Sequence, residues 1–254
     1  MLTVADFYRE LDTFAPFATA ETWDNVGLLV GSPDMPVKRV LFALDVTEDV
    51  LAEAKAMCCE LIISHHPVIF TPIKSLSAEN IVYKLVAAGI AVICAHTNLD
   101  LANGGVNDIL TDIFELSDVR GLQMQENGCL LGRIGKLKTP ITADNLALFV
   151  KQRLNAGAVR IIRGQDEIST VAVCGGSGCM LLHDAKKAGA QALITGEAKH
   201  NELILARELG ITLIDAGHHN TEIVALMPLM KKFAKTFDGC ELFVSKAAEP
   251  ACYL

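Results

Sequence analysis

The stretch Val37–Asp45 (VKRVLFALD) is followed by Thr47–Met57 (TEDVLAEAKAM) and Glu60–Ile63 (ELII), and this succession decides the predicted fold. The first and third segments are short apolar runs, which is typical of buried strands, whereas the second carries acidic residues in its first turn and has the length of a helix. Glu79–Ala88 and Ile90–Ala95 continue the alternation. Strands that alternate with helices indicate βαβ units and a largely parallel sheet with covered faces.

The second half of the chain repeats this order. Leu41–Asp45 aligns with Ala172–Gly176, and Ser64–His66 aligns with Thr195–Glu197. Identities between the halves are few, so chance is the alternative to an internal duplication. A polar stretch, Gly121–Gly128, marks the expected boundary. We therefore expect an α/β fold of two similar α/β domains related by duplication, residues 1–125 and 126–254. The C-terminal tail is free to pack back on the first domain. The ligand loops at the strand ends are expected to face a shared cleft.

Composition narrows the class of protein. Of 254 residues, 51% are hydrophobic and 20% are charged, which is typical of a globular chain. The net charge of −8 disfavours a nucleic-acid partner. No apolar run reaches the roughly 18 residues of a membrane helix, and residues 1–16 do not resemble a signal peptide. The eight cysteines include no C-x-x-C pair, so we expect reduced thiols in a cytoplasmic protein.

Three histidine-rich loops each follow an apolar run: Ser64–Pro67, His96–Asp100 and His218–Glu222. Strand ends are where α/β proteins build their sites. Imidazole and carboxylate together favour zinc, iron, nickel or manganese. The sequence therefore predicts a metal centre.

Each loop leaves alternatives open. Adjacent residues of an extended strand point to opposite faces, so His65 and His66 require two metals or a bent loop, unless both are solvated. His218 and Glu222 share a helix face at i and i+4, although Glu222 near a helix N-terminus is favoured without any metal. The loop that carries Asp100 is expected not to be helical.

The remaining residues in and near the three histidine-rich loops can be given roles as ligands, supporting groups or structural residues. Asp100 is the better ligand of its loop, and His96 is as well suited to orienting a ligand by hydrogen bonding. Glu197 is a candidate general base beside a metal, although an ordinary helix start explains it equally well. His183 is expected to be structural. Gly175–Gly178 is read as a tight turn in preference to an anion cradle.

Taken together, the motifs resemble those of the Ngg-one-interacting factor three family, often labelled GTP cyclohydrolase I type 2 homologues. The resemblance spans nearly the whole chain and fits the short form of the family, which lacks an inserted middle domain. It rests on Glu21–Gly31, Ser64–Pro67, His96–Asp100, Thr195–His200 and Asp215–Glu222.

The resemblance implies a ring-shaped homohexamer with dinuclear metal sites. The implied ligands, carried over position by position, are His65, His66, Asp100, His218 and Glu222. His219 departs from the tyrosine that is usual in the family. Two divalent ions per subunit are implied, with zinc, iron, manganese or nickel open.

From these observations we expect a metal-dependent hydrolase, with Glu197 or His96 moving the proton. The resemblance suggests a purine nucleotide such as GTP as the small-molecule substrate. The alternative is a metal-binding scaffold or regulatory protein without catalysis. A ring that encircles DNA is disfavoured by the net charge, and no membrane partner is expected.

Overall fold

The computed structural model describes residues 1–126, 128–247 and 249. It contains a five-stranded sheet and a six-stranded sheet, so the mixed α/β class expected from the sequence is confirmed. The residues group into two compact units. Among the described residues, unit 1 consists of residues 1–102 and 225–247, and unit 2 consists of residues 103–126, 128–224 and 249.

The sheet of unit 1 has the order β1-β4-β3-β2-β11. Its strands are β1 (Gly27–Val30), β2 (Arg39–Ala43), β3 (Leu61–Ser64), β4 (Ala91–Cys94) and β11 (Glu241–Val244). All neighbours are parallel except β1, which runs antiparallel to β4. The three central strands are buried along almost their whole length, which explains their continuous apolar sequences.

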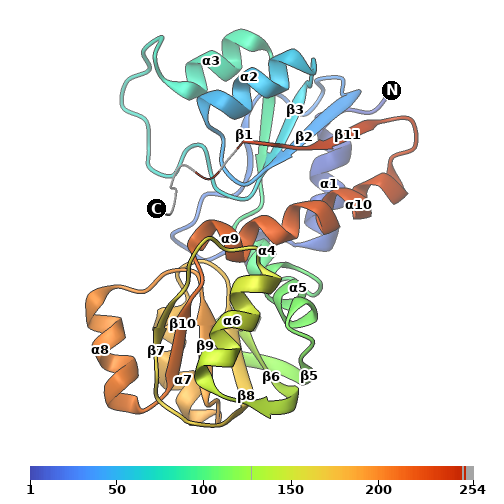
Figure 1. The fold of residues 1–254 in the computed structure, drawn as a ribbon. Helices are drawn as coiled ribbons and strands as arrows, with labels where there is room; N and C mark the ends of the chain where they lie inside the picture. The colour runs from blue at the N-terminus through green and yellow to red at the C-terminus, as the bar shows by residue number, and fades with distance from the viewer. Residues whose placement is uncertain (127, 248, 250–254) are drawn as a thin grey trace. The chain divides into compact units, whose positions relative to one another are not determined.

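Helices cover both faces of this sheet (Figure 1). The helices of unit 1 are α1 (Val4–Phe14), α2 (Glu48–Ala56), α3 (Ile81–Ala88), α4 (Thr97–Leu101) and α10 (Leu226–Thr236), with the short 3-10 helix η1 (Phe17–Thr19). Helices α2 and α3 share one apolar core with the sheet. On the other face, the Phe233 ring of α10 lies 5.5 Å from Phe42 of β2 and 6.2 Å from Phe7 of α1, measured between ring centroids.

Local sequence explains where these helices begin and end. The Thr47 hydroxyl accepts a hydrogen bond from the backbone N–H of Val50, and the Asn80 carbonyl accepts one from Val82, so each side chain caps a helix N-terminus. Gly89 ends α3 in the left-handed conformation with φ of 67°. These caps lie where the sequence predicts helix ends.

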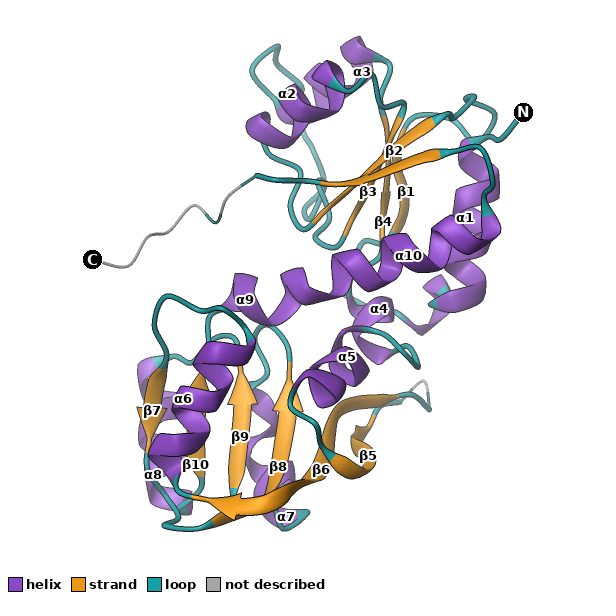
Figure 2. Cartoon of the chain, turned by 45° about the vertical axis from the view of Figure 1, so that its right-hand side comes forward, coloured by secondary structure: helices purple, strands orange, loops and turns teal. Residues whose placement is uncertain are grey.

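The sheet of unit 2 has the order β5-β6-β8-β9-β10-β7. Its strands are β5 (Ser117–Met124), β6 (Leu130–Ile141), β7 (Arg160–Ile162), β8 (Ile168–Cys174), β9 (Ala192–Thr195) and β10 (Thr212–Asp215). Strands β8, β9 and β10 are parallel, and the remaining pairs are antiparallel. Figure 2 shows the arrowheads of β8 and β9 at the same edge of the sheet.

The helices of unit 2 are α5 (Val106–Ile113), α6 (Ala143–Arg153), α7 (Leu182–Lys187), α8 (His200–Leu209) and α9 (His218–Glu222), with the 3-10 helices η2 (Cys179–Leu181) and η3 (Ile223–Ala225). The last residue of η3, Ala225, is the first residue of the later segment of unit 1. Leu182, Ala185 and Ala206 pack from α7 and α8 into a core with Leu193 of β9 and Leu213 of β10.

Several features differ from the sequence expectation. The polar stretch Gly121–Gly128 does not mark the end of a unit, because its first four residues belong to β5, which pairs with β6 in one sheet. Residue 125, where the domain division was expected, directly follows β5. The last strand, β11, joins the sheet of unit 1 by pairing with β2.

The sequence led us to expect no membrane-spanning helix and reduced cysteines. Among the helices of the described residues, none combines the length and the apolar character that crossing a membrane requires. No disulfide forms among the seven cysteines in the described part of the chain. Burial raises the pKa of Cys59 to about 11 and that of Cys179 to about 12.

Replacing Phe233 by alanine should destabilise the protein. The side chain is fully buried and contacts aromatic rings of α1 and β2, so its loss leaves a cavity that costs about 3–5 kcal/mol. Urea unfolding followed by circular dichroism measures the effect. Leu148→Ala removes a side chain that is 64% exposed and should change the free energy of unfolding by less than about 0.5 kcal/mol. Equal effects of the two substitutions would contradict this description of the core.

Candidate metal centre

Polar residues of unit 1 gather at one edge of its sheet. Asp45, His65 and His96 each follow closely on the C-terminal end of β2, β3 or β4. Because these three strands are parallel neighbours, their C-terminal ends meet at the same edge. The strand alternation of the sequence thereby brings residues from three loops together.

The His65-His66 pair adopts a bent loop. Strand β3 ends at Ser64, whose hydroxyl donates to the carbonyl oxygen of His66 at 2.9 Å. The two imidazole rings lie 5.0 Å apart between centroids and are tilted by 44°. Opposite faces of a strand would separate the two rings. The bent-loop alternative is therefore the one that the structure adopts.

Three imidazoles form a compact group in unit 1. One ring nitrogen from each of His65, His66 and His96 lies within 4.8 Å of those from the other two, which is a spacing that could hold a metal ion. Asp100 extends the group, with its Oδ1 atom 3.8 Å from His65 Nε2. The pair His65 and Asp100 lies deep in the unit, since their side chains are 2% and 17% exposed.

Each of these imidazoles is held through its Nδ1 atom. The carbonyl oxygen of Ala95 accepts from His65 Nδ1 at 3.0 Å, Asp45 Oδ1 accepts from His66 Nδ1 at 2.8 Å, and Asp24 Oδ1 accepts from His96 Nδ1 at 2.8 Å. A neutral imidazole that donates through Nδ1 carries its lone pair on Nε2. This tautomer and the acceptors behind it are typical of metal-binding histidines.

Asp24 is the more deeply buried of the two carboxylate acceptors. Its carboxylate also accepts from the backbone N–H of Thr97 at 3.1 Å and from the Thr97 hydroxyl at 2.5 Å. Burial alone would raise the pKa of the Asp24 carboxyl, but the hydrogen bonds from His96 and Thr97 lower it to about 2. Asp24 is therefore an ionised anchor for the start of α4.

Unit 2 assembles a second group at its own strand ends. His218 follows β10, and its Nε2 atom lies 3.1 Å from Glu222 Oε2, one helical turn later in α9. Its Nδ1 atom lies 3.1 Å from Glu197 Oε2, after β9. The hydrogen bond from Ser177, followed by that from His218, lowers the pKa of the Glu197 carboxyl. Glu197 thus holds His218 as Asp24 holds His96.

Helix capping does not account for Glu222. It is the last residue of α9, not part of its first turn, and its side chain is only 4% exposed. A carboxylate buried to this degree requires hydrogen bonds, an ion pair or a cation beside it. The placement of Glu222 favours the ligand interpretation of the sequence.

Two glycines give α9 its position. A Cβ atom at Gly176 would overlap Glu222 Oε1, and one at Gly196 would overlap the Thr221 hydroxyl and approach the His218 Cα atom to 2.8 Å. The Gly176 amide donates to the Thr221 hydroxyl at 3.0 Å, and the Gly178 amide donates to that of Thr195 at 2.9 Å. These two amides of the glycine loop are thus bound to side chains, which agrees with a tight turn and not with an anion cradle.

The donor set of both groups suits a divalent metal. Imidazole nitrogens and carboxylate oxygens are the ligands of zinc, iron, nickel and manganese sites, and the acceptors behind the imidazoles provide the supporting hydrogen bonds. The first group is His65, His66, His96 and Asp100, and the second is His218, Glu222 and Glu197. The groups belong to different units, and their convergence on one centre stays a prediction.

The sequence interpretation was incomplete in two places. It did not give Asp24 or Asp45 a role, although the motif that carried the family resemblance includes Asp24. It also expected a loop over His96–Asp100, whereas Thr97–Leu101 forms the short helix α4. His183, expected to be structural, lies on α7 outside both groups and is exposed.

Removing the Asp24 carboxylate should destabilise the chain. Asp24→Ala leaves the ring of His96 and two donors of Thr97 without their acceptor, a loss that we expect to cost about 1–3 kcal/mol. Chemical denaturation measures this difference. Asp166→Ala, at an exposed carboxylate, is the control and should leave the midpoint unchanged. A wild-type midpoint for Asp24→Ala would show that the anchor contributes nothing.

The sequence and the structure both have relatives among known proteins. A GTP cyclohydrolase 1 type 2 homolog of Clostridium perfringens is 32% identical over 254 residues, which is 96% of each chain. One from Streptomyces coelicolor is 36% identical over 234 residues, covering 87% of this chain and 82% of the relative. Among solved structures, a hypothetical protein of Staphylococcus aureus superposes with a TM-score of 0.92 at 30% identity and 99% coverage of both chains.

A family model covers almost the entire sequence. The Duf34/NIF3 (NGG1p interacting factor 3) model matches residues 2–250, the same span over which the motifs of the three histidine loops occur. The chain therefore belongs to the Duf34/NIF3 family.

Proposed function

We propose that this protein is a metal-dependent hydrolase that binds two divalent ions through His65, His66, Asp100, His218 and Glu222. One observation carries the proposal. In both units, an imidazole at a strand end is fixed through Nδ1 by a carboxylate or a carbonyl, so its Nε2 atom is the nitrogen directed to a ligand. A hydrogen-bond acceptor at the second ring nitrogen is a regular feature of metal-binding histidines, because it orients the imidazole toward the metal. A solvated surface histidine does not require such an acceptor.

The protein residues would divide the work between binding and proton transfer. A divalent ion supplies Lewis acidity and makes water a better nucleophile near neutral pH. Glu222, a buried carboxylate, would help to hold the ions. Glu197 or His96 would accept and return the proton, since each carries a titratable group beside the proposed ligands.

The proposed substrate is a purine nucleotide such as GTP. The printed name of the clostridial and streptomycete relatives, GTP cyclohydrolase 1 type 2 homolog, is the support for this substrate class. The reaction would open the imidazole ring of the purine by hydrolysis. The oxygen of water would bond to the ring carbon between the two nitrogens, and one carbon–nitrogen bond would break. Of the two protons of the water, one would pass to the released nitrogen and the other to the nitrogen that keeps the formyl group.

The proposal includes a homohexameric ring in the cytoplasm, as the resemblance implied. The same metal ligands also serve the alternative, a metal-binding scaffold that performs no catalysis. Metal content and turnover therefore have to be measured separately, because the first tests the ligands and the second tests the reaction.

Substitution of the proposed ligands should remove metal. We expect wild-type protein to hold about two ions per chain by elemental analysis, and His66→Ala, His218→Ala and Glu222→Ala each to hold about one or fewer. His183→Ala is the matched control, because this histidine is exposed on α7 and belongs to neither group. Full metal content in all three ligand variants would disprove the assignment.

The reaction should depend on Glu197 separately from metal binding. Glutamine at this position can still accept the hydrogen bond from His218 Nδ1 but cannot take up a proton. Glu197→Gln is therefore expected to lower kcat for GTP hydrolysis about 10²–10⁴-fold while the metal content stays unchanged. Glu208→Gln, on the exposed surface of α8, should keep full activity. Intact metal without turnover in the wild-type protein would support the scaffold instead.

A further inference from the structure

We propose that Trp23 and Phe70 form an aromatic platform that binds a planar aromatic ring of the substrate beside the histidine group of unit 1. This inference rests on the proposed function and names the part of the substrate that is recognised. It gives a role to two large side chains that the ligand set leaves unexplained.

The platform consists of two exposed aromatic rings and one imidazole. Trp23 is 59% exposed and Phe70 is 54% exposed, although both have large apolar surfaces. Their ring centroids lie 6.0 Å apart, and both are edge-on to His96, at 6.1 Å and 6.4 Å. Single exposed apolar residues are common, but contiguous exposed aromatic rings mark sites of binding.

The rings are held in place by polar anchors. Trp23 precedes Asp24, whose carboxylate is bound by His96 and Thr97, so the backbone on one side of the indole is fixed. The Asn25 amide donates to the carbonyl oxygen of Ile69 at 2.6 Å, which ties the loop of Trp23 to the loop of Phe70. A surface fixed before binding loses little conformational entropy when a ligand arrives.

The platform is continuous with the proposed metal ligands. The His96 ring that contacts Trp23 and Phe70 also lies 5.2 Å from His65 and 5.4 Å from His66, edge to face. A flat ring stacked on Trp23 or Phe70 would therefore lie one imidazole away from the histidine group. Residues 65–80, which carry Phe70, have no regular secondary structure, and connections longer than about 12–15 residues of this kind are usually functional.

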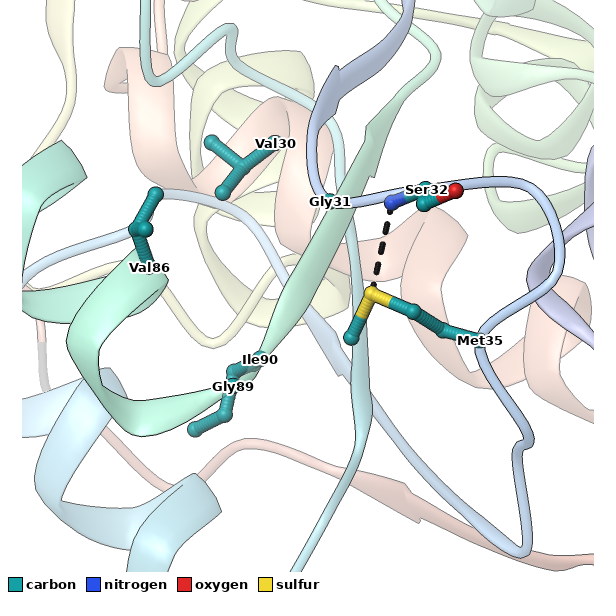
Figure 3. A pocket seen from close by; sticks show the side chains of 7 residues that line it. All are labelled: Val30, Gly31, Ser32, Met35, Val86, Gly89 and Ile90. Atoms are coloured by element: carbon teal, nitrogen blue, oxygen red, sulfur yellow. Dashed lines mark hydrogen bonds between the residues drawn. The ribbon is translucent and has the colours of Figure 1, made fainter.

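A pocket elsewhere in unit 1 lacks this chemistry. A pocket of about 220 Å³ is lined by Val30, Gly31, Ser32, Met35, Val86, Gly89 and Ile90 (Figure 3). Because Val30 pairs with Val92 at the start of β4, this pocket lies toward the opposite end of the strands from His96. It offers no aromatic ring and no charged group.

The ligand chemistry follows from the ring faces. Stacking on aromatic side chains suits any planar heterocycle and is worth about 1–3 kcal/mol per base. An organic cation would also be attracted to the rings, but the neighbouring carboxylate of Asp24 is buried and already bound by His96 and Thr97. A planar heteroaromatic ring is therefore the occupant that fits best.

The single tryptophan of the chain makes a direct test available. Guanosine 5′-monophosphate should quench the fluorescence of Trp23 in a saturable manner in the intact protein, with free N-acetyltryptophanamide correcting for absorption by the nucleotide. Ribose 5-phosphate and tetramethylammonium, which lack an aromatic ring, should cause no saturable quenching. Equal quenching by either of them would overturn the inference.

Variants separate the platform from the metal ligands. Phe70→Ala and Phe70→Leu should each weaken binding of guanosine 5′-monophosphate about 5- to 150-fold, and calorimetry should show a similar loss for Trp23→Ala. Tyr83→Ala, at an exposed aromatic residue of α3, is the matched control and should bind normally. All variants should retain the wild-type metal content.

The outcomes distinguish this inference from the proposed function. Wild-type affinity in the folded Phe70→Leu and Trp23→Ala proteins would refute the platform while leaving the metal assignment intact. Loss of metal from His66→Ala without any change in quenching would support the platform independently. Wild-type metal in all ligand variants would refute the proposed function whatever the platform binds.

Discussion

The hydrogen bond at Nδ1 of each strand-end histidine is the interaction on which the candidate site depends. An imidazole has two nitrogens, and only the one without a proton can bind a metal. By occupying Nδ1 with the carbonyl of Ala95 or with the carboxylates of Asp45 and Asp24, the fold selects Nε2 in each ring. Because β2, β3 and β4 are parallel, their C-terminal ends place the imidazole rings and their acceptors at the same edge of the sheet.

Unit 2 meets the same requirement through close backbone packing. Its carboxylate Glu222 and imidazole His218 lie on a helix of five residues, too short to be stable alone. Gly176 and Gly196 have no side chains, and this lets the helix α9 approach the ends of β8 and β9. Thr221 then bonds the loop amide of Gly176, so the site geometry is fixed by backbone proximity as well as by charge.

The sequence allowed the strand ends to be predicted but not the anchors. Continuous apolar runs before His65, His96 and His218 mark buried strands, and the parallel order follows from the intervening helices. Which nitrogen of each ring binds a ligand depends on partners far along the chain, as with Asp24 and His96, separated by 72 positions. No local pattern encodes such a pair. The bend after Ser64 was likewise open, because periodicity assumes a strand that continues.

His96 connects the two parts of the proposed site. Its ring lies edge-on to the rings of Trp23 and Phe70, and edge-on to those of His65 and His66 as well. A rotation of this one imidazole would disturb the aromatic rings and the histidine group together. The carboxylate of Asp24, buried and ionised, opposes such a rotation because it would lose its donor from His96 without access to water. The buried Asp24 carboxylate therefore fixes the position of His96. Through His96 it also fixes the aromatic rings of the proposed substrate platform relative to the histidines proposed to bind metal.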